Sequence, residues 1–218
     1  MRKLFVIGSI LLLVSCIFSV NESTIQFRGD NIIPLAIGNK WIYQYTITDG
    51  DSIRFNGPMT VEIIESRIIE YEGEQLNVFV FKETCGHYSF EDSLLYYLLS
   101  TSNDTIFWVG HSVHGTFSDG YDPYYYNKNI HVIYPLQIGE KWEFDHGDYH
   151  DNFECVSLTD TVLVDEFSLS CVNIRMGNPP NWYNDYLYCP SVGLVNEYTF
   201  GSTSTYRIER ILIRNILF

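Results

Sequence analysis

The chain has 218 residues with 13 Lys and Arg against 27 Asp and Glu, which gives a formal net charge of −14 at pH 7. Nucleic-acid binding depends on basic side chains that displace counterions, so this composition argues against a nucleic acid as partner. The length allows one large all-β domain or two small ones, and either can bury a core.

Residues 1–15 have the pattern of a secretion signal. Arg2 and Lys3 form a cationic start, and an apolar run of about eleven residues follows at 4–14. A helix needs about 20 apolar residues to cross a bilayer, so a permanent transmembrane span is disfavoured. The run ends in Leu-Val-Ser-Cys at residues 13–16, which resembles the lipobox of bacterial lipoproteins. The resemblance implies cleavage after residue 15 and lipidation of Cys16; an ordinary secretory signal is the alternative.

A lipid on Cys16 would fix the protein to a membrane of the cell envelope. Several acyl chains, at about 0.8 kcal/mol per buried methylene, make such attachment stable. Cleavage leaves 11 basic and 27 acidic side chains, so the surface would repel anionic headgroups and the lipid must hold the membrane. Residue 17 is Ile rather than Asp, which favours the outer over the inner membrane if the host is Gram-negative. Residues 16–32 are then the lipidated Cys and a tether.

A duplicated motif organises the rest of the chain. Residues 34–43 read Pro-Leu-Ala-Ile-Gly-Asn-Lys-Trp-Ile-Tyr, and residues 135–144 read Pro-Leu-Gln-Ile-Gly-Glu-Lys-Trp-Glu-Phe. Six of the ten positions are identical at a constant offset of 101. We therefore predict two β-units, residues 33–133 and 134–218, within one compact domain.

The pattern within the units is that of β structure. Residues 60–66 and 206–211 alternate apolar and polar side chains, as a strand with one buried face does. Turns rich in Asp, Asn and Gly recur at short intervals, and no long stretch after the signal has helical periodicity. We expect the Leu and Ile of each motif to dock inward before the Trp strand. The alternative is that Trp41 and Trp142 line a ligand site.

The motif also carries a family resemblance. Pro-Leu-x-x-Gly-x-x-Trp-x-Tyr near the start of the domain, with Gly-Leu-Val at residues 193–195 before a final strand, resembles a widespread set of uncharacterised bacterial secreted proteins and lipoproteins. The resemblance covers most of residues 33–213. It implies an antiparallel all-β fold, as a curved open sheet or a barrel-like sheet, and an extracytoplasmic location. It supplies no catalytic residue.

Four cysteines remain after the signal, at positions 85, 155, 171 and 189, and four thiols allow three pairings. Cys171 and Cys189 lie nine residues on either side of Pro180, within a turn-rich stretch. A hairpin about that point would set the two thiols opposite each other. We predict a Cys171–Cys189 disulfide, with buried free thiols as the alternative.

One acidic segment has the side chains of a metal site. It holds three carboxylates and two imidazoles in seven residues, namely Asp145, His146, Asp148, His150 and Asp151. The spacing is not that of an EF-hand, and the segment follows the second Trp strand, where a polar turn is expected. A solvated turn is therefore favoured over a cation site. No cofactor is expected, because phosphate-binding Gly loops are absent.

Two segments are rich in aromatic side chains and in Asp and Asn. Their aromatic residues are Tyr121, Tyr124, Tyr125 and Tyr126 in the first, and Trp182 and Tyr183 in the second. Tyr offers a large, fairly rigid surface with a polar tip, which suits a sugar ring or a protein partner. Packing of these rings over the ends of the sheet is the alternative.

Together these patterns predict a lipid-anchored envelope protein that binds a ligand or partner, such as a glycan or an envelope protein, and is not an enzyme. A structural or assembly component of an envelope complex is the second hypothesis. A hydrolase comes third, because no Gly-x-Ser-x-Gly arrangement occurs.

Overall fold

The computed structural model describes residues 32–86, 94–102, 105–113, 125–145, 150–164, 167–179, 181–201 and 206–217. These residues form a single sheet of 12 strands, and every neighbouring pair is antiparallel. The predicted all-β, antiparallel, barrel-like fold is confirmed. Within the described ranges, no helix has the length and apolarity that a membrane span requires.

The strands follow one another as two meanders of six. In chain order they are β1 Lys40–Asp49, β2 Ser52–Tyr71, β3 Glu74–Cys85, β4 Leu94–Ser102, β5 Thr105–Val113, β6 Tyr125–Ile133, β7 Lys141–Asp145, β8 His150–Val164, β9 Phe167–Asn178, β10 Trp182–Cys189, β11 Gly193–Gly201 and β12 Tyr206–Ile216. Their order in the sheet is β6-β5-β4-β3-β2-β1-β12-β11-β10-β9-β8-β7. The first and last strands therefore pair at the centre, and the boundary predicted at residue 133 falls between the two end strands.

The duplicated motif has the same local geometry in both copies. The amide of Gly38 donates to the Ile63 carbonyl at 2.8 Å, and the amide of Gly139 donates to the Cys155 carbonyl at 2.8 Å. Both glycines have positive φ, 92° and 83°, where a residue with a Cβ is strained. The shared Gly is therefore explained by the turn that leads into β1 and β7.

The structure corrects the expectation for the Ile of the motif. The Leu packs inward in both copies, and Leu136 is 5% exposed. Ile37 and Ile138 are instead 55% and 68% exposed. Each Ile is the second residue of a four-residue turn, closed by hydrogen bonds from the amides of residues 39 and 140 to the carbonyls of residues 36 and 137. A side chain at that position projects away from the turn into solvent.

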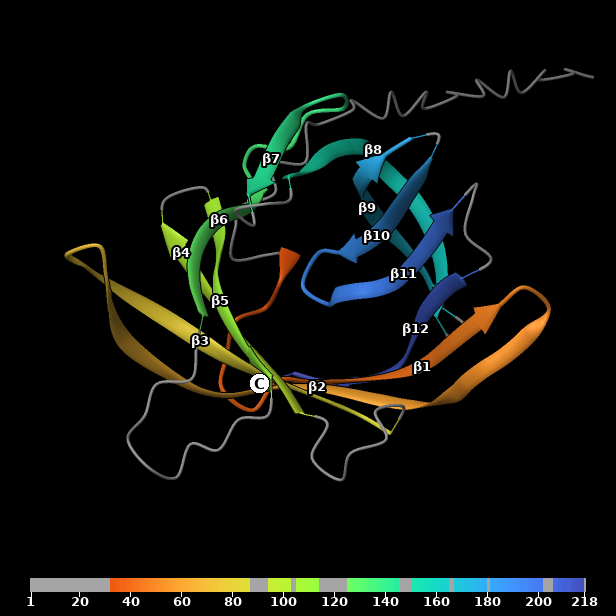
Figure 1. Cartoon of the computed structure of the whole chain (residues 1–218), viewed down its shortest axis with the longest axis horizontal. Helices are drawn as coiled ribbons and strands as arrows, with labels where there is room; N and C mark the ends of the chain where they lie inside the picture. The colour runs from red at the N-terminus through yellow and green to blue at the C-terminus, as the bar shows by residue number, and fades with distance from the viewer. Residues whose placement is uncertain are drawn as a thin grey trace, which may run out of the picture.

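The sheet curves until its two ends lie side by side. Figure 1 shows β6 and β7 next to each other, with the ring of strands nearly closed. These end strands do not pair through their backbones, although residues 134–140 connect them directly. The ring of His131 on β6 lies 6.5 Å from that of Phe153 on β8 and 6.2 Å from that of Trp108 on β5. We call this junction between β6 and β7 the seam.

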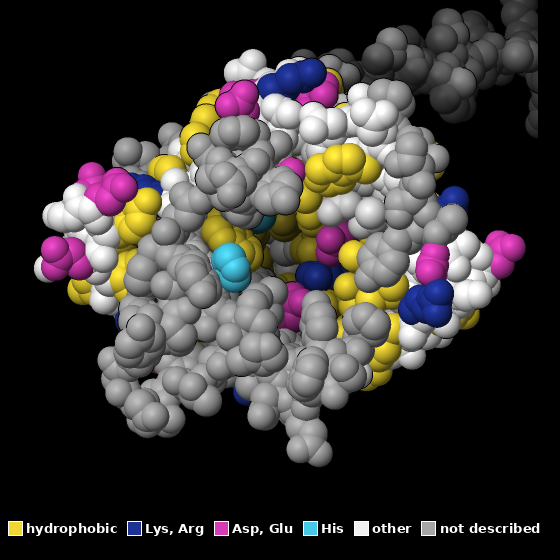
Figure 2. All heavy atoms as spheres, viewed as in Figure 1, with side chains coloured by type: hydrophobic (Ala, Val, Ile, Leu, Met, Phe, Trp, Pro, Cys, Tyr) yellow, Lys and Arg dark blue, Asp and Glu magenta, His cyan; other side chains and the backbone are white. Residues whose placement is uncertain are grey.

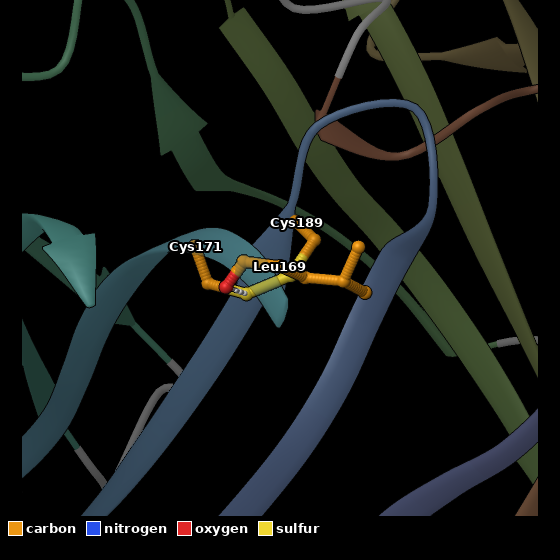
Figure 3. The surroundings of a disulfide bond; sticks show 3 residues. All are labelled: Leu169, Cys171 and Cys189. Atoms are coloured by element: carbon orange, nitrogen blue, oxygen red, sulfur yellow. Dashed lines mark hydrogen bonds between the residues drawn. A yellow bond between two sulfur atoms is a disulfide. The ribbon is translucent and has the colours of Figure 1, made fainter. Parts of the chain in front are cut away.

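A disulfide joins β9 and β10. The structure bonds Cys171 to Cys189, beside Leu169 (Figure 3). The β9–β10 register sets Tyr188 opposite Val172, so the two cysteines come next, at the end of the ladder away from the turn. This covalent link lies in the inner core, where both cysteines are buried.

Candidate ligand-binding site

Inside the barrel-like sheet lies a cavity of about 400 Å³ that is open to solvent. Eleven of the 12 strands, all but β7, supply lining residues among the side chains that the structure describes. Many of them are aromatic: Trp41, Tyr43, Tyr45, Phe81, Trp108, Phe153, Tyr186 and Tyr188, with His131 beside them. Figure 2 shows a hollow at the centre of the molecule, with apolar side chains around it and acidic and basic side chains within it. The cavity is thus both aromatic and charged.

Strand alternation explains how charges reach the interior. Glu83 lies two residues after Phe81 on β3, Glu197 lies two residues after Val195 on β11, and Arg210 lies two residues before Leu212 on β12. Residues two apart in a strand point to the same face of the sheet. Because their neighbours face the core, these three charged side chains face it as well.

The three charges form one buried ion cluster. Nε of Arg210 lies 3.1 Å from Oε2 of Glu197, and its Nη2 lies 3.6 Å from Oε2 of Glu83. The side chains are only 15% exposed for the Arg, 10% for Glu197 and 7% for Glu83. Ionised groups this deeply buried are costly unless they are paired, so each depends on the others.

Two tyrosines of β1 support the guanidinium. The Arg210 guanidinium carbon lies 5.5 Å from the ring centroid of Tyr43 and 5.8 Å from that of Tyr45, within reach of cation–π attraction. The Tyr43 hydroxyl donates to the Leu194 carbonyl at 3.0 Å, which fixes its ring. Burial raises the pKa of Tyr43 far above its ordinary value, so the phenol stays neutral. The rings of Tyr43 and Tyr45 therefore help to position Arg210 within the ion cluster.

The ion cluster has more negative than positive groups. Two carboxylates share one guanidinium, and burial raises the pKa of Glu83, an effect that Arg210 opposes and Glu197 reinforces. Glu83 therefore keeps a proton to higher pH than a solvated Glu does.

At the seam the cavity wall is uncharged at neutral pH. Burial lowers the pKa of His131 to about 4, so its imidazole is neutral at pH 7. Its Nε2 lies 3.3 Å from the hydroxyl oxygen of Tyr188, and burial raises the pKa of that phenol well above its ordinary value. The two ring groups thus form a neutral hydrogen-bonding pair. Among the described lining residues, the acidic and basic side chains other than His131 are those of the cluster around Arg210.

The predicted aromatic residues of β10 lie outside the cavity. Trp182 is 37% exposed at the start of the strand. The ring of Tyr183 stacks on Phe200 at 5.1 Å, and the guanidinium carbon of Arg175 lies 4.1 Å from its centroid. Arg175 is itself held by Asp185 at 2.7 Å. Because the protein's own side chains already cover the Tyr183 ring, little of it is available to stack on a sugar.

For the other predicted aromatic residues, the structure describes the backbone of two and no side chain. Tyr125 and Tyr126 begin β6 and pair with residues 111 and 110 of β5. Their side chains, and the whole of Tyr121 and Tyr124, lie outside the described residues. Ligand binding by this segment stays a prediction.

The described part of the acidic segment lies at the end of β7 and the start of β8. Asp145 ends β7 and pairs with His150, the first residue of β8, and Asp151 is the next residue along. His146 and Asp148 lie outside the described residues. In the described part of the chain no three His, Cys, Asp or Glu side chains gather as a metal site. Metal binding here stays a prediction, and lipidation of Cys16 also lies outside the described residues.

Sequence reasoning missed the charged centre of the cavity. Glu83, Glu197 and Arg210 are not among the site residues predicted from the sequence. The sequence does carry a signal for them. Each of the three lies two positions from an apolar residue, and residues two apart in a strand share a face. Of the two motif tryptophans, Trp41 lines the cavity. Trp142 stacks on Phe153 at 5.6 Å and is not among the lining residues.

No protein-family model matches this sequence, and no curated protein matches it. Among solved structures, the chain is similar to a "putative exported protein with YmcC-like fold" from Bacteroides fragilis. The identity is 12%, the match covers 85% of this chain and 99% of that chain, and the TM-score is 0.47. It is also similar to a "putative lipoprotein" from Parabacteroides distasonis, with 12% identity, coverage of 85% and 98%, and a TM-score of 0.44. Membership of the motif family stays a prediction.

Proposed function

We propose that this chain is a lipid-anchored protein of the bacterial cell envelope that binds a small, largely apolar ligand inside its barrel-like sheet. One observation carries the binding role: the interior cavity of about 400 Å³, walled by aromatic rings around a buried ion cluster. Ligand sites in proteins typically have volumes of about 300–1,000 Å³ and combine apolar walls with a few convergent polar groups. The anchor rests on the lipobox that ends at Cys16.

Binding without catalysis fits the state of the polar groups. Both carboxylates in the cavity face Arg210, at 3.1 Å for Glu197 and 3.6 Å for Glu83. A carboxylate that serves as general base or nucleophile must reach the substrate atom within hydrogen-bonding distance. Groups that are engaged with one another orient a ligand more readily than they transfer its protons.

A dye titration tests the proposal. The mature protein is titrated with Nile Red, a neutral dye whose emission shifts to the blue in apolar surroundings. We expect saturable binding at one site. Ile208→Trp fills the cavity from β12 and should weaken binding at least about tenfold, which is 1.4 kcal/mol.

The matched control lies on the same strand. Ile213 is 44% exposed on β12, so Ile213→Trp adds the same indole outside the cavity and should change affinity by less than about twofold. Equal loss in both variants, or binding that never saturates, would refute a site inside the sheet.

A further inference from the structure

The charges that line the cavity do not balance. Among the lining residues, Glu83 and Glu197 are acidic and Arg210 is basic, while His131 is neutral at pH 7. The cluster therefore carries one more carboxylate than guanidinium. At an exposure of 10% or less, the two carboxylates have little water to compensate this excess.

Among the described residues that line the cavity, an anionic ligand finds no counter-charge that is not already paired with carboxylates. Arg210 already faces two carboxylates, through its Nε and its Nη2. The head group of a fatty acid or a phosphate would bring further negative charge to a buried site that already holds two acidic side chains, and like charges in contact are strongly unfavourable. The charges in the cavity therefore disfavour binding of an anionic ligand.

A cationic ligand, in contrast, would balance the second carboxylate of the ion cluster. Burial raises the pKa of Glu83, and a cation placed beside this carboxylate would stabilise its ionised form. The aromatic rings favour a cation as well, because the faces of Trp and Tyr attract ammonium groups. Trp41, Tyr186 and Tyr188 line the cavity together with the cluster. The net charge of −14 on the whole chain also raises the local concentration of cations.

We propose that the cavity selects cationic amphiphiles: ligands in which one ammonium or amidinium group is attached to a short apolar body. The cationic head pairs with Glu83 and Glu197, and the apolar body lies along the aromatic wall towards the seam. This inference rests on the proposed function, because it names the ligand class of the same cavity.

Three competitors with the same tail test the inference. Octyltrimethylammonium, octanoate and 1-octanol each displace Nile Red from the mature protein, at concentrations below micelle formation. We expect the ammonium compound to bind at least about tenfold more tightly than octanoate, with octanol between them. Equal affinities, or tighter binding of octanoate, would overturn the inference.

Variants that remove a buried carboxylate test whether these groups cause the preference for the ammonium compound. Glu197→Gln removes one buried carboxylate with little change of shape and should reduce the preference for ammonium over octanol to about twofold or less. Glu83→Gln serves as the second variant if the first does not fold. Glu209→Gln is the control, because Glu209 lies between Ile208 and Arg210 on the same strand and outside the cavity lining. It removes the same charge and should keep the full preference.

The possible failures are distinguishable. If Nile Red binds inside the sheet but no preference for ammonium is found, only the ligand class is wrong. The same holds if both Gln variants keep the preference. If Nile Red does not bind inside the sheet, the proposed function falls as well.

Discussion

Nε2 of His131 lies 3.3 Å from the hydroxyl oxygen of Tyr188, although 57 residues separate them in the chain. His131 belongs to β6 and Tyr188 to β10, so the contact joins the first meander to the second. Both side chains line the cavity, so the contact crosses the interior between two halves whose end strands do not pair through their backbones. This side-chain contact therefore adds to the chain connection between β6 and β7 in closing the sheet.

Acid should weaken this closure. The folded-state pKa of His131 is about 4, below the ordinary 6.5, so the unfolded chain takes up the proton at higher pH than the folded protein does. The stability that the neutral imidazole contributes is present above pH 6.5 and is lost as the pH falls towards 4. The difference between these two pKa values corresponds to about 3 kcal/mol in the free energy of unfolding.

Chemical denaturation between pH 7 and pH 4 measures the effect. The free energy of unfolding should fall more steeply for the wild type than for His131→Gln, with a difference of up to about 3 kcal/mol at pH 4. The acidic residues titrate in both proteins, so the comparison isolates the imidazole. Parallel pH profiles would show that His131 is not held neutral by burial.

The Cys171–Cys189 disulfide should stabilise the fold. The two residues are 18 apart, and closing a loop of this size stabilises a protein by about 3 kcal/mol through the unfolded state. The double variant Cys171→Ala/Cys189→Ala should lose about that much in denaturant unfolding. Peptide mapping without reduction should recover the two cysteines in one linked product. Alkylation of both thiols in unreduced, unfolded protein would contradict the pairing.

Two glycines with similar backbone strain should differ in their tolerance of Ala. Gly139 has φ of 83° and no atom within 4 Å of an added Cβ, so Gly139→Ala should cost about 1–2 kcal/mol of strain. At Gly193, with φ of 96°, an added Cβ would lie 3.1 Å from Nε1 of Trp41, whose N–H donates to the Val192 carbonyl. Gly193→Ala should therefore cost about 3 kcal/mol or more. Thermal unfolding measures both, and equal costs would contradict the contact.

The lipid anchor can be tested in cells. Wild-type protein should incorporate labelled palmitate and sediment with membranes, whereas Cys16→Ser should do neither, because the thiol accepts the lipid. Cys155→Ser is the matched control, since Cys155 is buried in β8 and should not affect labelling. Palmitate incorporation into Cys16→Ser would exclude the assigned lipidation site.

Local patterns could be predicted from the sequence because their causes are local. The alternation at residues 60–66 falls within β2, and the Gly of the repeated motif marks a turn with positive φ in both copies. The error at Ile37 and Ile138 arose because an apolar residue was assumed to face inward, whereas its place in the turn directs it outward. At these two positions the geometry of the turn, and not the hydrophobicity of Ile, determines where the side chain points.

The candidate site could not be predicted, because it depends on contacts between distant strands. Glu83, Glu197 and Arg210 come from β3, β11 and β12, which meet only after β1 pairs with β12. Each residue alone resembles an ordinary surface charge. Only the pairing of the first and last strands brings the three side chains to one interior position.

The position of a bound ligand can be observed directly. Crystals of the mature protein soaked in 1-bromooctane, a neutral apolar compound, would reveal the bromine by its anomalous scattering. A site inside the sheet predicts a peak in the cavity, among Trp41, Tyr43 and Tyr188. Anomalous peaks confined to the outer surface, with an unchanged interior, would contradict it.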